Sequence, residues 1–195
     1  MATYLFSTLQ NNQRIEFDPA VDVFRLDDPS LSAAQLQYAV PDGIGDSISF
    51  THQGKTVVLA GSGLLGRITT SNVQVGTGAA GSGAIYAGRA DGTLVIGGYG
   101  PDLMLGLATG DRLNGGAGDD TLDGRAGNDL LTGGRGNDRL IGGAGLDTAD
   151  YSGETGALTA GVTASLSSGE ATDPFGGTDT LSGIEYLTGT ALSDT

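Results

Sequence analysis

The chain contains no cysteine, and it has only one histidine among its 195 residues. The absence of cysteine excludes disulfides, thiolate metal sites and thiol redox chemistry. A single histidine, His52, provides no partner for a histidine-based zinc site or for a histidine-dependent catalytic triad. The sequence therefore lacks the side chains on which many catalytic centres depend.

Basic residues are scarce. The chain has nine Lys and Arg against 23 Asp and Glu, which gives a formal net charge of −14. Nucleic acid is excluded as a partner, because that affinity comes largely from basic side chains that neutralise phosphates. The acidic excess instead favours cations, and its carboxylate oxygens suit hard divalent ions.

Long apolar runs are also missing. No stretch of 18 apolar residues occurs, so no transmembrane segment is expected. The N-terminal sequence MATYLFSTLQNNQRIEF shows no basic stretch followed by an apolar run, and it does not have the pattern of a cleavable secretory signal. Cytoplasmic residence and export without a signal peptide both stay open at this point.

What the chain does have is glycine, with 36 residues, and the glycines of one segment recur with a period of nine. Residues 97–150 form six units, in which position one is always Gly, position six is always Asp and position eight is always apolar. The units read GGYGPDLML, GLATGDRLN, GGAGDDTLD, GRAGNDLLT, GGRGNDRLI and GGAGLDTAD. The apolar positions hold Met104, Leu113, Leu122, Leu131, Leu140 and Ala149.

Each unit combines a tight turn with a very short strand, and two units make one coil of a solenoid. We predict an all-β fold, a parallel β-roll whose eighth positions point inward from both sides to form a thin core. Positions seven and nine are then expected to face water, and they hold Leu103, Arg112, Thr121, Leu130, Arg139 and Thr148, and Leu105, Asn114, Asp123, Thr132, Ile141 and Asp150.

The coil places aspartates that are 18 residues apart above one another. One column contains Asp102, Asp120 and Asp138, and the other contains Asp111, Asp129 and Asp147. Carboxylates about 4.8 Å apart repel by roughly 3 kcal/mol at an effective dielectric near 20. Divalent ions between them would reverse this repulsion, and turn carbonyls could complete the six or more oxygen ligands that calcium prefers. We expect at least four calcium ions and no other cofactor.

Glycine is expected at positions one, two and four, because the turn must reach φ > 0 and bring carbonyl oxygens close to the ion. The carbonyl candidates are Gly97, Gly98, Gly100, Gly106, Gly115, Gly116, Gly118, Gly124, Gly127, Gly133, Gly134, Gly136, Gly142, Gly143 and Gly145. Leu107, Thr109 and Arg125 replace glycine at three of these positions.

Three segments of the chain differ in composition and in the regularity of their repeats. Residues 1–78 have ordinary apolar content, with alternating strands and a turn at His52-Gln53-Gly54, and are predicted to form a small N-terminal β-rich cap that includes a helical turn within 28–36. Residues 79–150 are predicted to form the roll, with 79–96 a degenerate terminal unit. Residues 151–195 are predicted to be degenerate coils or a spacer, in which 177–182 mimics half a unit and 189–194 opens a further, truncated one.

The pattern GGxGxDxUx, with U a large apolar residue, resembles the repeats-in-toxin (RTX) family of secreted bacterial proteins, strongly over 97–150 and weakly over 79–96. The resemblance implies a calcium-bound parallel β-roll, export by type I secretion machinery that reads a C-terminal signal, and folding outside the cell or at its surface. Family members carry enzymes or adhesins beside the roll, and no such domain is visible here.

The sequence therefore predicts a noncatalytic calcium-binding module of a secreted bacterial protein. An alternative is a self-assembling surface-layer, filament or adhesin subunit whose rolls associate through strand edges or ends. A third possibility is an accessory module of a secreted enzyme whose catalytic part is not in this chain. Other motifs are weaker: glycine patterns at 61–66 and 76–81 formally match a dinucleotide fingerprint but lack the helix that must follow it.

Overall fold

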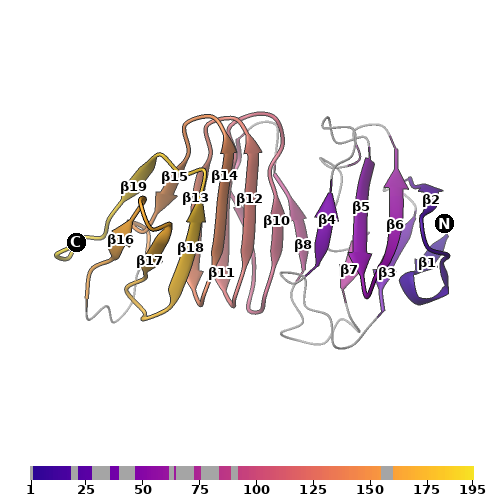
Figure 1. Cartoon of the computed structure of the whole chain (residues 1–195), viewed down its shortest axis with the longest axis horizontal. Helices are drawn as coiled ribbons and strands as arrows, with labels where there is room; N and C mark the ends of the chain where they lie inside the picture. Colours follow the sequence, from indigo (N-terminus) through magenta and orange to yellow (C-terminus); the bar gives the residue numbers. More distant parts are fainter. Residues whose placement is uncertain are drawn as a thin grey trace.

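The computed structural model of the chain describes residues 2–18, 22–27, 36–39, 47–61, 64, 73–75, 84–88, 92–154 and 160–195. Regular structure in these ranges is β-strand, apart from one 3₁₀ turn, η1 (Phe6–Thr8). The strands follow one another along the long axis, with the N-terminal segment at one end and the C-terminal segment at the other (Figure 1). Among the helices of the described residues, none has the length and apolar content needed to cross a membrane.

Two sheets form the roll. The seven-stranded sheet runs in the order β16 (Thr163–Ser165), β17 (Glu170–Thr172), β18 (Thr178–Ser182), β14 (Arg139–Ala144), β12 (Thr121–Ala126), β10 (Leu103–Leu105) and β8 (Ile85–Ala87). The five-stranded sheet runs in the order β19 (Tyr186–Thr188), β15 (Thr148–Asp150), β13 (Leu130–Arg135), β11 (Arg112–Ala117) and β9 (Val95–Ile96).

Neighbouring repeat strands are parallel and pair residues that are 18 positions apart. Leu122 pairs with Leu140 in one sheet, and Leu113 pairs with Leu131 in the other. Successive units therefore alternate between the two sheets, and two units complete a coil. The prediction of an all-β parallel β-roll is confirmed.

The core of the roll lies between the two sheets and is built from position eight. All six of its predicted side chains are at most 1% exposed, because alternate residues of each strand point to opposite faces. Val95, Tyr151, Val162, Ala171, Leu181 and Ile184 extend the same cluster at its two ends.

Positions seven and nine do not all face water, and this part of the prediction is wrong for the first unit. Leu103 and Leu105 are 0% exposed, and Thr121 is buried as well. The two leucines point away from the roll core, into a second apolar cluster formed with the N-terminal segment. Apart from Thr121, the later residues at these positions are half-buried or exposed, because the N-terminal segment covers only the first strands.

The N-terminal segment contains two further sheets. A four-stranded sheet has the order β2 (Gln13–Glu16), β6 (Lys55–Ala60), β5 (Ser47–His52) and β4 (Gln37–Ala39), and a three-stranded parallel sheet has the order β1 (Thr3–Leu5), β3 (Val23–Leu26) and β7 (Val73–Val75). The hairpin expected at residues 52–54 joins β5 to β6. Apart from Leu36, the expected helical turn lies outside the described residues, as does most of both glycine motifs.

The C-terminal segment leaves the roll and returns to it. Strands β16 and β17 pair antiparallel with each other, and β17 pairs antiparallel with β18. Strand β18 then rejoins the parallel ladder, with Leu181 opposite Leu140, and β19 continues the other sheet, with Leu187 opposite Ala149. An inserted hairpin therefore interrupts the sequence period without ending the solenoid.

Candidate metal centre

The six repeat aspartates lie in the two predicted columns. Each stands at the end of a glycine-rich turn, directly before or one residue from the next strand, and each is at most 2% exposed. Burial of six carboxylates is costly, since each loses its hydration and must recover the free energy from new partners.

One oxygen of each carboxylate already has a backbone partner. The backbone N–H of Asp102 donates to Oδ1 of Asp120 (2.7 Å), and the N–H of Asp120 donates to Oδ1 of Asp138 (2.8 Å). The second column repeats the pattern, with Asp111 donating to Asp129 and Asp129 donating to Asp147, both at 2.8 Å. The aspartates are therefore fixed in orientation by the neighbouring coil rather than stacked as bare charges.

The second oxygen has no such partner in the later turns. The Oδ2 atoms of Asp120, Asp129, Asp138 and Asp147 are buried and accept no hydrogen bond. By contrast, Oδ2 of Asp102 accepts the N–H of Gly98 (2.8 Å) and Oδ2 of Asp111 accepts the N–H of Leu107 (2.7 Å), so the first turn of each column differs. Four turns thus present a buried carboxylate oxygen without a donor, and a bound cation would compensate its negative charge.

Position-one glycine leaves room for the aspartate carboxylate of its own turn and for a carbonyl oxygen of the next coil. A Cβ on Gly115 would overlap the Asp120 carboxylate and lie 2.7 Å from the carbonyl oxygen of Gly133 in the next coil. Of the two reasons predicted for this glycine, positive φ is wrong, because no position-one residue has positive φ. Positive φ is required in the later turns at positions two and four, as at Gly134 (φ 102°), and Arg125 adopts it (φ 70°) where glycine is replaced.

Burial dominates the electrostatics of the columns. Burial, followed by the charge of neighbouring carboxylates, raises the pKa of Asp120 to about 7 and that of Asp138 to about 8. The pKa of Asp129 rises to about 6 for the same reasons. The ion-free turns therefore resist full ionisation at neutral pH, and a bound divalent cation would relieve this cost.

Both columns continue beyond the repeats. The N–H of Asp138 donates to Oδ1 of Asp179 (2.9 Å), and the N–H of Asp147 donates to Oε2 of Glu185 (2.9 Å). The inserted hairpin changes the spacing within a column from 18 residues to 41 for Asp138 and Asp179, and to 38 for Asp147 and Glu185. Asp179 could still be found from the half unit at 177–182, whereas no repeat pattern marks Glu185.

The donor set suits a hard divalent ion. Among the described residues, no three His, Cys, Asp or Glu side chains converge closely enough to hold an ion by themselves. Any ion in a turn must therefore combine one or two carboxylates with backbone carbonyls. Oxygen ligands of this kind, on a flexible glycine backbone, fit calcium better than magnesium, which demands a smaller and more rigid octahedron.

The remaining candidates do not join this centre. His52 lies in the N-terminal hairpin, where its ring contacts that of Phe6. Asp119 is exposed, and its Oδ1 accepts the backbone N–H of Asn137 (2.8 Å), so it stands outside the buried columns.

Comparison with known families and proteins gives one match. Residues 96–131 and 114–149 match the family described as RTX calcium-binding nonapeptide repeat, in four copies. No curated protein matches the chain. The matched segments cover less than a third of the chain, and they coincide with the repeat strands and all six buried aspartates. Residues 96–149 are thus a block of RTX-type calcium-binding nonapeptide repeats.

Proposed function

We propose that this chain is a noncatalytic calcium-binding module of a secreted bacterial protein, and that its roll folds as calcium binds outside the cell. The observation that carries the proposal is the set of four buried, unpartnered Oδ2 atoms in successive turns. The six column aspartates and the turn glycine carbonyls named above are the proposed ligands, and at least four ions are expected.

Folding and binding are coupled in this proposal. Ordering a glycine-rich backbone costs about 1 to 2 kcal/mol per residue, and the thin core of the roll returns only part of this. Calcium supplies the remainder and is abundant in extracellular fluid. The lack of cysteine suits a protein that is stapled by ions rather than by disulfides. Export by a type I machine rests on the family alone.

The test compares far-UV circular dichroism of the calcium-stripped chain before and after titration with calcium. We expect strand signal to appear with calcium, and Asp120→Asn to raise the calcium concentration at half-folding by about tenfold or more. Asp119→Asn is the matched control, because its carboxylate is adjacent in sequence but exposed. A spectrum unchanged by calcium, or equal midpoints for the two variants, would contradict the proposal.

A second candidate, self-association of rolls, draws on one observation. Among the described strands, β9 is the outer strand of the five-stranded sheet. Apolar side chains in it and just after it are exposed: Ile96 is 59% exposed and Tyr99 is 89% exposed. Open strand edges with exposed apolar groups can pair with another copy. Sedimentation velocity with calcium should then show concentration-dependent size, which Ile96→Lys would abolish; a monomer at all concentrations removes this candidate.

A further inference from the structure

Two buried carboxylates outside the nonapeptide repeats lack partners. Glu154, in the loop after β15, is 8% exposed, and neither of its carboxylate oxygens makes a hydrogen bond. Asp173, in the turn between β17 and β18, is 2% exposed, and its Oδ2 is also unpartnered. These two residues therefore present three buried acceptor oxygens without donors. Neither residue belongs to the two aspartate columns, so the proposed ligands of the repeat turns do not account for them.

Both residues lie next to Phe175: Glu154 lines the same groove as Phe175, and Asp173 accepts the backbone N–H of Phe175 (2.7 Å). After burial, Asp173 is the charged group that contributes most to the pKa of Glu154, which rises to about 8. Asp179 and Asp138 act on Glu154 in the same direction. Neither Glu154 nor Asp173 takes part in the ion pair found among the described residues, and buried carboxylates without such a pair are poorly stabilised in the absence of a cation.

The surroundings of Asp173 repeat the design of the repeat turns. Its Oδ1 accepts the backbone N–H groups of Phe175 (2.7 Å) and Gly177 (2.9 Å), which fixes the carboxylate and leaves Oδ2 without a partner. A Cβ on Gly177 would lie 2.7 Å from that Oδ2 and would overlap the carbonyl oxygen of Gly136 in the preceding coil. A carboxylate oxygen and a carbonyl oxygen thus adjoin one small space that only glycine leaves open.

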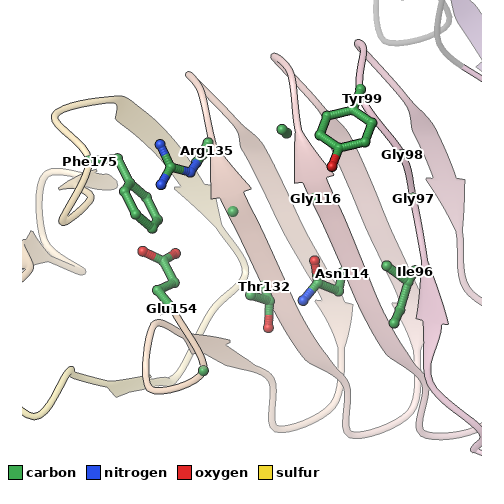
Figure 2. A pocket seen from close by; sticks show the side chains of 13 residues that line it. Ile96, Gly97, Gly98, Tyr99, Asn114, Gly116, Thr132, Arg135, Glu154 and Phe175 are labelled. Atoms are coloured by element: carbon green, nitrogen blue, oxygen red, sulfur yellow. The ribbon is translucent and has the colours of Figure 1, made fainter. Parts of the chain in front are cut away.

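Glu154 lies in the wall of a surface groove, although its carboxylate oxygens are buried. It lines one end of a groove of ≈ 400 Å³, together with Arg135 and Phe175. Figure 2 shows the Glu154 carboxylate extending from its loop toward the Phe175 ring, over which the Arg135 guanidinium lies at 4.0 Å. This groove provides a path by which an ion could reach Glu154.

We propose that Glu154 and Asp173, with the carbonyl oxygen of Gly136, form an additional calcium site between the loop after β15 and the turn before β18. The site uses side chains that the nonapeptide pattern does not contain, and it closes the roll where the inserted hairpin replaces a regular turn. From the proposed function it takes only the premise that the chain meets calcium. Carboxylate and carbonyl oxygens are the ligand types that calcium takes.

The test counts bound calcium by isothermal titration and equilibrium dialysis on the whole chain. We expect Glu154→Gln to bind one ion fewer than the wild type and to unfold at a lower temperature in calcium. Glu170→Gln is the matched control, because Glu170 is exposed on β17 in the same hairpin and makes the same change in charge. It should bind the full number of ions.

Asp173→Asn is the second variant, designed to preserve the fold. Its amide oxygen can still accept the N–H groups of Phe175 and Gly177, so only the ligand atom Oδ2 is replaced. We expect this variant also to lose one ion. Without calcium, Glu154→Gln should be at least as stable as the wild type, because it removes a buried charge.

Several results would overturn the proposal. An unchanged ion count in both variants would do so, and an unchanged count with weaker binding would assign Glu154 to the ion of Asp138 instead. If Arg135→Gln reproduces the destabilisation of Glu154→Gln with or without calcium, Glu154 is the partner of Arg135 and the site does not exist. A wild type that binds no calcium overturns the proposed function as well, whereas loss of the additional ion alone leaves that function intact.

Discussion

At the scale of single residues, the turns contain carboxylates whose two oxygens have different tasks. Oδ1 of Asp138 is held by the N–H of Asp120, whereas Oδ2 is buried without a donor. The first oxygen sets the geometry before any ion arrives, and the second supplies a ligand. This division explains why aspartate is constant at position six: asparagine would keep the hydrogen bond but lose the charge.

A prediction on pH follows from the same residues. Burial raises the pKa of Asp120 to about 7 and that of Asp138 to about 8, above the value near 3.9 of an unfolded chain. Without calcium, the folded turns therefore bind protons more tightly than the unfolded chain does. The free energy of unfolding of the ion-free roll should rise as pH falls from about 8 toward about 4.

Far-UV circular dichroism of calcium-stripped protein at about pH 8 and about pH 5 measures this effect, and the residual strand signal should be greater at the lower pH. In saturating calcium the order should reverse, since protons compete with the ion for the same oxygens. An ion-free roll that loses stability on acidification would contradict the assignment of the raised pKa values to these turns.

The sequence predicted the two aspartate columns but not every carboxylate that belongs to them. Asp120 and Asp138 could be found because a constant spacing of 18 residues translates directly into stacked coils. Glu185 could not, because the hairpin of β16 and β17 breaks the period, and only three-dimensional pairing shows that it follows Asp147. Nor could the sequence separate glycines that need positive φ, such as Gly134, from those such as Gly115 that need only space.

At the scale of elements, each repeat strand has one face toward the thin core and one toward solvent. In β14, Leu140 is 0% exposed while its neighbour Ile141 is half-buried on the opposite face. Strands of three to six residues offer few apolar contacts each, so a single inward side chain accounts for much of the packing of its coil.

Leu140→Ala should therefore lower the free energy of unfolding of the calcium-bound protein by about 2 to 5 kcal/mol, the usual cost of a cavity at a buried leucine. Ile141→Ala should cost clearly less, because its side chain keeps part of its hydration in the folded state. Chemical denaturation of both variants in saturating calcium provides the comparison. Equal losses would show that the inward and outward faces are not energetically distinct.

At the scale of the whole molecule, the roll and the N-terminal segment share apolar packing. Leu103 and Leu105 belong to the cluster that contains Phe24 and Phe50 of the N-terminal sheets. The hydroxyl of Tyr38 on β4 also donates a hydrogen bond to Asp123 on β12. The apolar run Leu103-Met104-Leu105 indicates that this strand is covered on both faces. The sequence does not identify the segment that covers Leu103 and Leu105, because that segment lies far away in the chain.

We predict that Leu105→Ala destabilises the protein more than Ile141→Ala, although both residues occupy position nine of their units. Leu105 is fully buried beneath the N-terminal segment, and Ile141 has no such cover. Differential scanning calorimetry in calcium should show a lower unfolding temperature for Leu105→Ala. A shift no greater than that of Ile141→Ala would mean that the two parts are not energetically coupled.

The 18-residue coil also governs how far the polypeptide can stretch. Eighteen residues of extended chain span about 60 Å, whereas one coil adds only about 4.8 Å to the height of the stack. When calcium is withdrawn and a coil unfolds, its extended chain can therefore span about twelve times the height that the folded coil adds to the stack. A short compact rod would become a long, extensible tether, under the control of the concentration of an inorganic ion.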